Sequence, residues 1–111
     1  MSEIIIINSE SMGKGNEELG KTLTGAFLRK LWAQEKKPDN IILYNSAVKL
    51  IAEGSVVLDA MDGLYSAGVD IIACGTCVEL YQLKDSIKTG RISGMDEICA
   101  MLMHAGKVIT I

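Results

Sequence analysis

Short apolar runs alternate with helical segments along the whole of this 111-residue chain. The first run, Ile4–Ile7, consists only of isoleucine, which is typical of a strand buried on both faces of a sheet. Strands that alternate with helices form parallel βαβ units. The pattern therefore predicts an α/β protein with three layers, in which helices cover both faces of a mainly parallel sheet.

Five strands are expected, at Ile4–Ile7, Ile41–Tyr44, Val69–Ala73, Arg91–Ser93 and Lys107–Thr110. Helices are expected over Asn16–Gln34, from a Ser46 cap through Ala52, from a Ser55 cap to Ala67–Gly68, over Val78–Leu83 and from an Asp96 cap to Ala105. The apolar stripe of the first helix comprises Leu19, Leu23, Ala26, Phe27 and Leu31. The helix after Ser55 is expected to bury Val57, Leu58, Met61, Leu64 and Tyr65.

Length and charge narrow the classes of function. A chain of this size is expected to form one domain over residues 1–111. The net charge of −3 argues against nucleic acid or an anionic membrane as a partner. No apolar run approaches the ~20 residues that span a bilayer, and the N-terminus has no basic lead of a secretory signal. We therefore expect a cytoplasmic protein whose three cysteines are reduced thiols, metal ligands or transient redox partners.

The carboxyl ends of parallel strands meet at one edge of the sheet, and ligands bind at that edge. The loops that follow the first four strands are small and polar: Asn8–Gly15, Asn45–Ser46, Cys74–Cys77 and Ser93–Met95. A glycine-rich turn such as 11–15 leaves N–H groups free for a small anion. The expected wall of a binding site comprises Ser11, Met12, Gly13, Gly15, Asn45, Ser46, Gly75 and Thr76.

Residues 15–22 match G-x-x-x-x-G-K-[ST], the phosphate-binding loop of nucleotide hydrolases. We reject this function because the carboxylates of Glu17 and Glu18 would repel a polyphosphate, and because Leu19 begins the apolar stripe of a helix. Instead, Gly15 or Asn16 is expected to cap the helix, with the two acids in its first turn. Lys21 then lies one turn inside the helix and takes no part in ligand binding.

The sharper motif is Cys74-Gly75-Thr76-Cys77, where a strand is expected to end and a helix to begin. A thiol at a helix N-terminus meets free N–H groups and the helix dipole, which lower its pKa and favour the nucleophilic thiolate. Gly75 permits a tight turn, and Thr76 is placed to cap the helix or donate a hydrogen bond. In sulfur transfer, one of Cys74 and Cys77 carries a persulfide and the other assists or resolves, in a reaction that needs no cofactor or metal. Cys77, at the loop–helix junction, is the more exposed candidate, whereas a strand can bury Cys74.

Two other roles fit a C-x-x-C motif. Thiol–disulfide redox proteins place it at a strand–helix junction. A zinc site would add Cys99 and His104, but five residues along one helix their side chains point roughly 140° apart. Cys99 is instead expected in the core with Met95, Ile98 and Leu102, and His104 at the helix end.

Three segments resemble the C-terminal domain of the YedF-type selenium-metabolism proteins, in the DsrE/F-like superfamily: "INSESMGKGNEELGKTL", "ILYNSAVKLIAEGS" and "IIACGTCVELYQLKDSIKTGRISGMDEI". The resemblance implies a five-stranded sheet of order 4-3-2-1-5 and assembly into trimers or hexamers. It also implies that Cys77 carries the cargo, as a persulfide for sulfur or as a selenosulfide for selenium. Cys74 corresponds to the added cysteine of the YedF-like branch. The TusA-like carrier domain often fused to these proteins is expected to act in trans.

Apolar side chains around the helices also predict a homo-oligomer. Met101 and Met103 are expected on outer sides of the last helix, and Val48 and Ile51 on the surface of the short helix before Ala52. Such surface is most simply covered by a second copy of the chain. The competing class of function is a non-catalytic oligomeric subunit that binds or regulates, in which the cysteines are structural.

Overall fold

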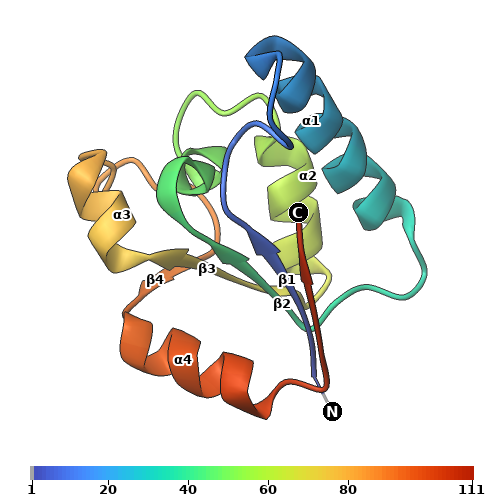
Figure 1. The fold of residues 1–111 in the computed structure, drawn as a ribbon, viewed down its shortest axis with the longest axis vertical. Coiled ribbons are helices and arrows are strands. Elements are labelled where there is room, and N and C mark those ends of the chain that lie inside the picture. The colour runs from blue at the N-terminus through green and yellow to red at the C-terminus, as the bar shows by residue number, and fades with distance from the viewer. Residues whose placement is uncertain (1) are drawn as a thin grey trace.

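The computed structural model describes residues 2–111 (Figure 1). Its strands are β1 (Glu3–Ile7), β2 (Asn40–Leu43), β3 (Asp70–Cys74), β4 (Arg91–Ser93) and β5 (Lys107–Thr110). Its helices are α1 (Glu17–Ala33), α2 (Leu58–Ser66), α3 (Gly75–Leu80), α4 (Met95–His104) and the 3₁₀ helix η1 (Asn45–Ile51). The five predicted strands are therefore confirmed to within a residue at each end.

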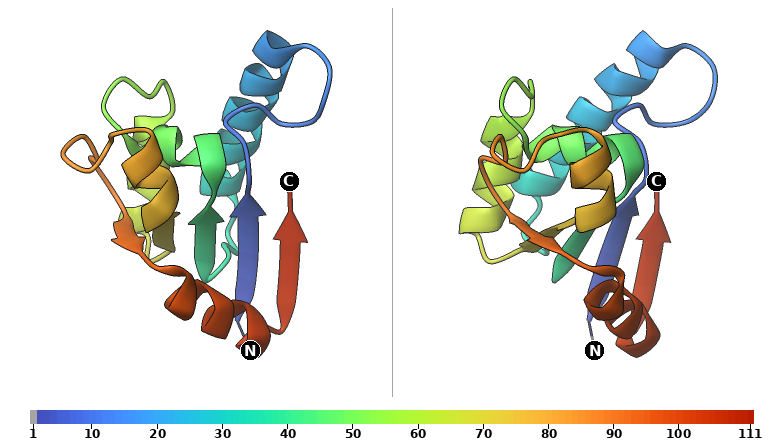
Figure 2. Two further views of the ribbon diagram at one scale, coloured as in Figure 1. Left: turned by 60° about the vertical axis from the view of Figure 1, so that its left-hand side comes forward. Right: turned by 90° about the vertical axis from the view of Figure 1, so that its left-hand side faces the viewer.

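The five strands form one parallel sheet in the order β4-β3-β2-β1-β5, which confirms the predicted fold and strand order. Alternate residues of each strand face opposite sides, as the two-residue period of a strand requires. Ile5 and Ile7 join the core beneath α1, α2 and η1, whereas Ile4 and Ile6 join a smaller core beneath α4. Figure 2 shows these helices on the two sides of the sheet.

The expected capping residues of three helices were wrong. Ser46 lies inside η1, which begins at Asn45, and its hydroxyl accepts a hydrogen bond from the Glu10 N–H at 3.0 Å. Ser55 lies three residues before α2 and accepts from the Val57 N–H instead. Asp96 lies in the first turn of α4, whose N-cap is Gly94. The hydroxyls of Ser46 and Ser55, which the sequence assigned to helix ends, thus accept hydrogen bonds from N–H groups outside the helices.

Helix α1 begins as predicted, because the Asn16 side chain accepts from the Leu19 N–H at 2.8 Å. Its predicted stripe was partly wrong, since Leu19 is 56% exposed and the buried residues are Gly20, Thr24 and Leu28. The loop before the helix folds back onto this buried face. The Met12 N–H donates to both the Gly20 carbonyl oxygen and the Thr24 hydroxyl at 3.0 Å.

Helix α4 also presents a different face from the one expected. Ile98 is fully buried, and the residues packed beside it on this side of the sheet include Met101, Leu102 and Ala105. This is a regular i, i+3, i+4, i+7 stripe. Cys99 lies outside the stripe and is exposed, so its assignment to the core was wrong. Met101, expected on the outside, packs against the core.

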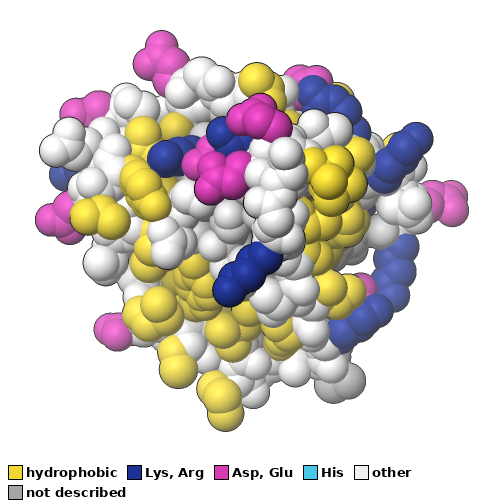
Figure 3. Space-filling view, turned by 45° about the horizontal axis from the view of Figure 1, so that its top comes forward, with side chains coloured by type: hydrophobic (Ala, Val, Ile, Leu, Met, Phe, Trp, Pro, Cys, Tyr) yellow, Lys and Arg dark blue, Asp and Glu magenta, His cyan; other side chains and the backbone are white. Residues whose placement is uncertain are grey.

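The surface still carries large apolar side chains, and Figure 3 shows hydrophobic groups gathered over a broad area of one face. Val48 and Ile51 are fully buried beneath η1, so their expected exposure was wrong. The most exposed apolar side chains are Val56, Leu80, Met103, Leu19 and Met95. Within residues 2–111, every helix falls short of the length and apolar composition needed to cross a membrane.

Candidate functional site

Cys74 and Cys77 lie at the carboxyl end of β3, at the strand–helix junction predicted for them. Cys74 is the last residue of the strand and the N-cap of α3, and it is 4% exposed. Cys77 lies in the first turn of α3, is half-buried, and packs against the cores on both sides of the sheet. Cys74 acts on Cys77 closely enough to raise the pKa of its thiol. A buried and a reachable thiol are thus adjacent.

The helix that carries Cys77 begins earlier than predicted. It spans Gly75–Leu80, whereas Val78–Leu83 was expected. Thr76 therefore lies within the first turn, with an exposed side chain, and does not cap the helix. Gly75 lies against the end of β4, where an added methyl group would be 3.4 Å from the Ser93 carbonyl oxygen. The cysteine loop is in this way packed directly on the edge of the sheet.

Asn45 makes the closest polar contact to Cys77 from another element. Its backbone N–H donates to the Cys77 sulfur at 3.0 Å. Its backbone φ is +51°, a left-handed conformation that asparagine tolerates better than most residues. Its side-chain oxygen accepts a hydrogen bond from the Tyr81 hydroxyl at 2.8 Å. Asn45, a predicted wall residue, therefore lies beside the cysteine.

A second set of contacts extends this cluster. The Lys49 ammonium lies 4.6 Å from the centre of the Tyr81 ring and pairs with Glu10 at 3.4 Å. Glu10 also donates its backbone N–H to Ser46. Sequence reasoning missed Lys49 and Tyr81. The spacing of these residues could have indicated them: Tyr81 follows Cys77 by four residues and Lys49 follows Asn45 by four, and residues four apart in a helix lie on the same side.

The thiol of Cys77 does not have the lowered pKa that was expected. Burial raises its pKa, and the hydrogen bond and charge of Cys74 raise it further, against the lowering effect of the Asn45 and Cys77 backbone N–H groups. Burial also raises the pKa of Tyr44, the residue between β2 and η1, with added repulsion from the three cysteines. The sequence argument considered the helix terminus but omitted desolvation, which here outweighs it.

The predicted glycine-rich turn is directed toward α1. The Ser11 hydroxyl donates to the Glu17 carbonyl oxygen at 2.8 Å, and Met12 is bonded to α1 as described above. Gly13 and Gly15 have φ of +78° and +134°, which glycine adopts readily. The interactions of this turn therefore run to the start of α1, while those of Asn45 run to Cys77.

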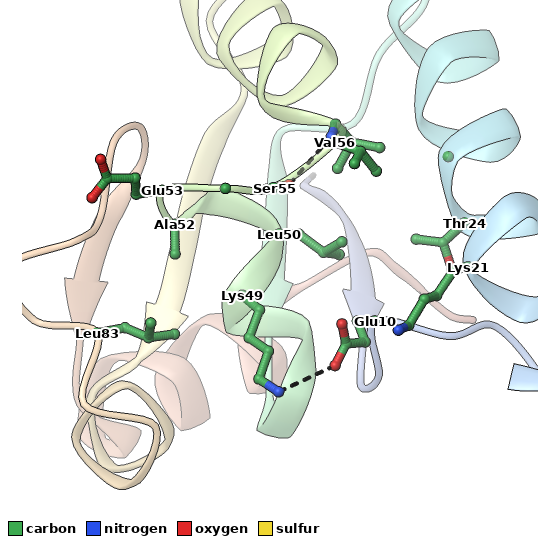
Figure 4. A pocket seen from close by; sticks show the side chains of 13 residues that line it. Glu10, Lys21, Thr24, Lys49, Leu50, Ala52, Glu53, Ser55, Val56 and Leu83 are labelled. Carbon is green, nitrogen blue, oxygen red and sulfur yellow. Dashed lines mark hydrogen bonds and ion pairs between the residues drawn. The ribbon is translucent and has the colours of Figure 1, made fainter. Parts of the chain in front are cut away.

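A pocket of about 400 Å³ lies beside the cysteine cluster, between η1, α1 and the segment 52–57 (Figure 4). Lys49 and Glu10 border it, so the pocket and the cluster share these two residues. Lys21 and Thr24 of α1 border it on the other side.

The zinc alternative requires several ligand side chains to converge. Within residues 2–111, no group of three His, Cys, Asp or Glu side chains is arranged to hold a metal ion. His104 lies at the end of α4, where its Nδ1 is 2.8 Å from the Ala100 carbonyl oxygen.

Comparison with protein-family models and with curated protein sequences found no match. Solved structures do match over almost the whole chain. The YchN protein of E. coli is 21% identical with a TM-score of 0.74, and the match covers 100% of both chains. MTH1491 of Methanobacterium thermoautotrophicum is 18% identical with a TM-score of 0.72, covering 98% of this chain and 97% of that one.

BT1422 of Bacteroides thetaiotaomicron is a third match, at 18% identity and a TM-score of 0.64, covering 99% of this chain and 95% of that one. These structures have the DsrE/F-like fold. This chain has a DsrE/F-like fold. At such low identity the likeness establishes the fold and agrees with the expected resemblance. The MTH1491 and BT1422 structures are titled as proteins of unknown function.

Proposed function

We propose that this chain is a carrier of sulfur or selenium that holds its cargo as a persulfide on Cys77. The observation that supports this most is the Asn45 N–H, which is 3.0 Å from a half-buried thiol at the ligand-binding edge of the sheet. A hydrogen bond to a sulfur favours its negative charge. Reactivity here would come from a positioned donor, since burial alone disfavours the thiolate.

Loading is a single exchange. The Cys77 thiolate attacks the outer sulfur of a donor persulfide, a new S–S bond forms, and the bond to the donor breaks. The donor sulfur leaves with the electron pair, and the product is a persulfide on Cys77. This exchange follows thiol–disulfide chemistry and requires only that the thiolate be formed and reachable.

Cys74 assists from a buried position beside Cys77. As a neighbouring sulfur it favours the protonated form of the Cys77 thiol, because its hydrogen bond and its charge both raise the pKa of Cys77. Once Cys77 carries a persulfide, the Cys74 thiolate would attack the inner sulfur, which belongs to Cys77. The bond to the outer sulfur breaks, hydrosulfide leaves with the electron pair, and a Cys74–Cys77 disulfide forms. This route would make the protein a thiol–disulfide redox protein as well, which is the alternative function that the contact between the two thiols favours.

The partners remain those implied by the resemblance. A TusA-like carrier in trans would supply or accept the sulfur, and the chain would assemble with copies of itself. The exposed side chains of Leu80, Met95 and Met103, rather than Val48 and Ile51, are the apolar surface that supports assembly. A non-catalytic oligomeric subunit is the competing function, and it requires no reactivity at Cys77.

The test is the intact mass of the protein after incubation with a persulfide donor. The wild type and Cys99→Ser should each gain ~32 Da, one sulfur atom, which reducing agent removes. Cys77→Ser should gain nothing. An adduct that survives Cys77→Ser and is lost in Cys74→Ser would move the carrier to Cys74. No adduct on any cysteine would favour the non-catalytic subunit.

A further inference from the structure

Two hydrogen bonds lead from the Cys77 sulfur through Asn45 to the Tyr81 hydroxyl. The Asn45 N–H donates to the sulfur, and the Tyr81 hydroxyl donates to the Asn45 side chain. We infer that the Asn45 N–H stabilises negative charge on Cys77, and that Tyr81 is a positioning residue that acts through Asn45. This inference rests on the proposed function and adds two residues to its mechanism.

The conformation of Asn45 explains why it needs to be held. Its φ of +51° is unfavourable for a residue with a side chain, and this conformation accompanies the donation of its N–H to Cys77. The 2.8 Å bond from Tyr81 to the Asn45 side-chain oxygen ties the residue from its other end. Asn45 is exposed, so without this bond its orientation would depend on the backbone alone.

Tyr81 is itself fixed on both sides. It follows the last residue of α3, and its N–H donates to the Cys77 carbonyl oxygen at 3.1 Å, which places it one helical turn beyond Cys77. The Lys49 ammonium packs on its ring at 4.6 Å and is held by Glu10 at 3.4 Å. Helix α3 and η1 are thereby joined across the cysteine.

The N–H would act when the cargo leaves. An acceptor thiolate attacks the outer sulfur of the Cys77 persulfide and forms a new S–S bond. The bond between the outer sulfur and the Cys77 sulfur breaks, and its electron pair stays on Cys77. A fixed N–H donor aimed at that sulfur stabilises the charge as it develops, which is the action of an oxyanion hole applied to a thiolate.

Other titratable groups also act on this sulfur. Cys74, at the end of β3, raises the pKa of Cys77 through a hydrogen bond and its charge, and Tyr44, the residue that follows β2, interacts with Cys77 through charge. Lys49 and Glu10 lie beyond Tyr81 and form an ion pair. Two backbone N–H groups favour the thiolate, that of Cys77 itself and that of Asn45, and only the second comes from another element of the structure.

The test is the rate at which iodoacetamide alkylates Cys77 as a function of pH, in a Cys99→Ser background that removes the exposed competing thiol. Tyr81→Phe deletes only the hydroxyl. It should raise the midpoint of the profile by about half a pH unit and slow alkylation near neutral pH roughly threefold, as for one weakened hydrogen bond. The plateau rate at high pH should stay the same. Tyr65→Phe, on α2, is the matched control and should change neither.

Asn45→Gly provides a second variant that keeps the N–H and tolerates the positive φ but removes the bond to Tyr81. It should raise the midpoint in the same direction. If both variants keep the wild-type midpoint, or if only the plateau rate rises, Tyr81 has no role in holding the thiolate. Because iodoacetamide reports on the thiol alone, this result is independent of persulfide loading, whose failure would instead count against the proposed function.

Discussion

Gly20 is the second glycine of the phosphate-loop pattern, and the structure gives it a packing role. It lies on the buried face of α1, against the loop that precedes the helix. A methyl group on Gly20 would lie 2.9 Å from the Met12 carbonyl oxygen and would collide with the Ser11 hydroxyl. The hydroxyl can rotate away only by losing its bond to Glu17, and the carbonyl belongs to the backbone.

We therefore predict that Gly20→Ala destabilises the protein. Overpacking costs about 1–3 kcal/mol, and the higher helix propensity of alanine returns about 1 kcal/mol. The net loss in the free energy of unfolding should be up to about 2 kcal/mol, towards the upper end because the Met12 backbone cannot move aside cheaply. Gly25→Ala is the matched control in the same helix, because its methyl group would meet only Val57, at an ordinary 3.5 Å. That change should be neutral or stabilising.

Urea unfolding followed by circular dichroism measures both variants. Because the same substitution is made twice in one helix, the propensity term cancels in the comparison. Equal stability of the two variants would refute the packing explanation for Gly20. The presence of glycine at position 20 would then have no structural explanation.

Three further predictions address the ligand, the surface charge and the assembly. Lys21→Ala should leave ATP and GTP binding unchanged in equilibrium dialysis, since Lys21 belongs to helix α1 and not to a phosphate-binding loop. Tight nucleotide binding that is lost in this variant would overturn the rejection of the phosphate-loop function. Hydrogen bonds from Arg91 and Ser93 lower the pKa of Glu97 to about 2, so the stabilising effect of this carboxylate should be lost as the pH falls from about 4.5 through 2. Thermal melts should show weaker acid sensitivity for Glu97→Gln than for the wild type, and equal sensitivity would contradict this. Light scattering should give a multiple of the 12.0 kDa chain mass, and a mass of one chain would exclude the oligomer.

The strands and their parallel arrangement could be predicted from the sequence because burial on both faces leaves a strong pattern. Ile4–Ile7 and the run before Cys74 are continuous apolar segments bounded by polar loops. Helix starts were less predictable, since Ser46 and Ser55 were available to loops as well as to helix ends. Side-chain oxygens in both settings satisfy the same kind of backbone N–H, so the sequence alone does not distinguish them.

The candidate site was predicted in part. The position of Cys74 and Cys77 follows from the strand–helix junction, which the sequence marks clearly. The contact of Asn45 with Cys77 depends on a single residue with φ of +51°, and the role of Tyr81 depends on that contact. The raised pKa of Cys77 depends on the depth of burial, which emerges only when helices α3 and η1 pack together.

The most direct test of the sulfur-carrier function is a complete cycle of loading and release on Cys77. The protein is loaded from a persulfide donor, freed of the donor, and mixed with an excess of a small acceptor thiol. We predict that the ~32 Da adduct, mapped to the peptide that contains Cys77, disappears while the acceptor gains one sulfur atom. An adduct that never forms on Cys77, or that stays there in the presence of the acceptor, would contradict the carrier function.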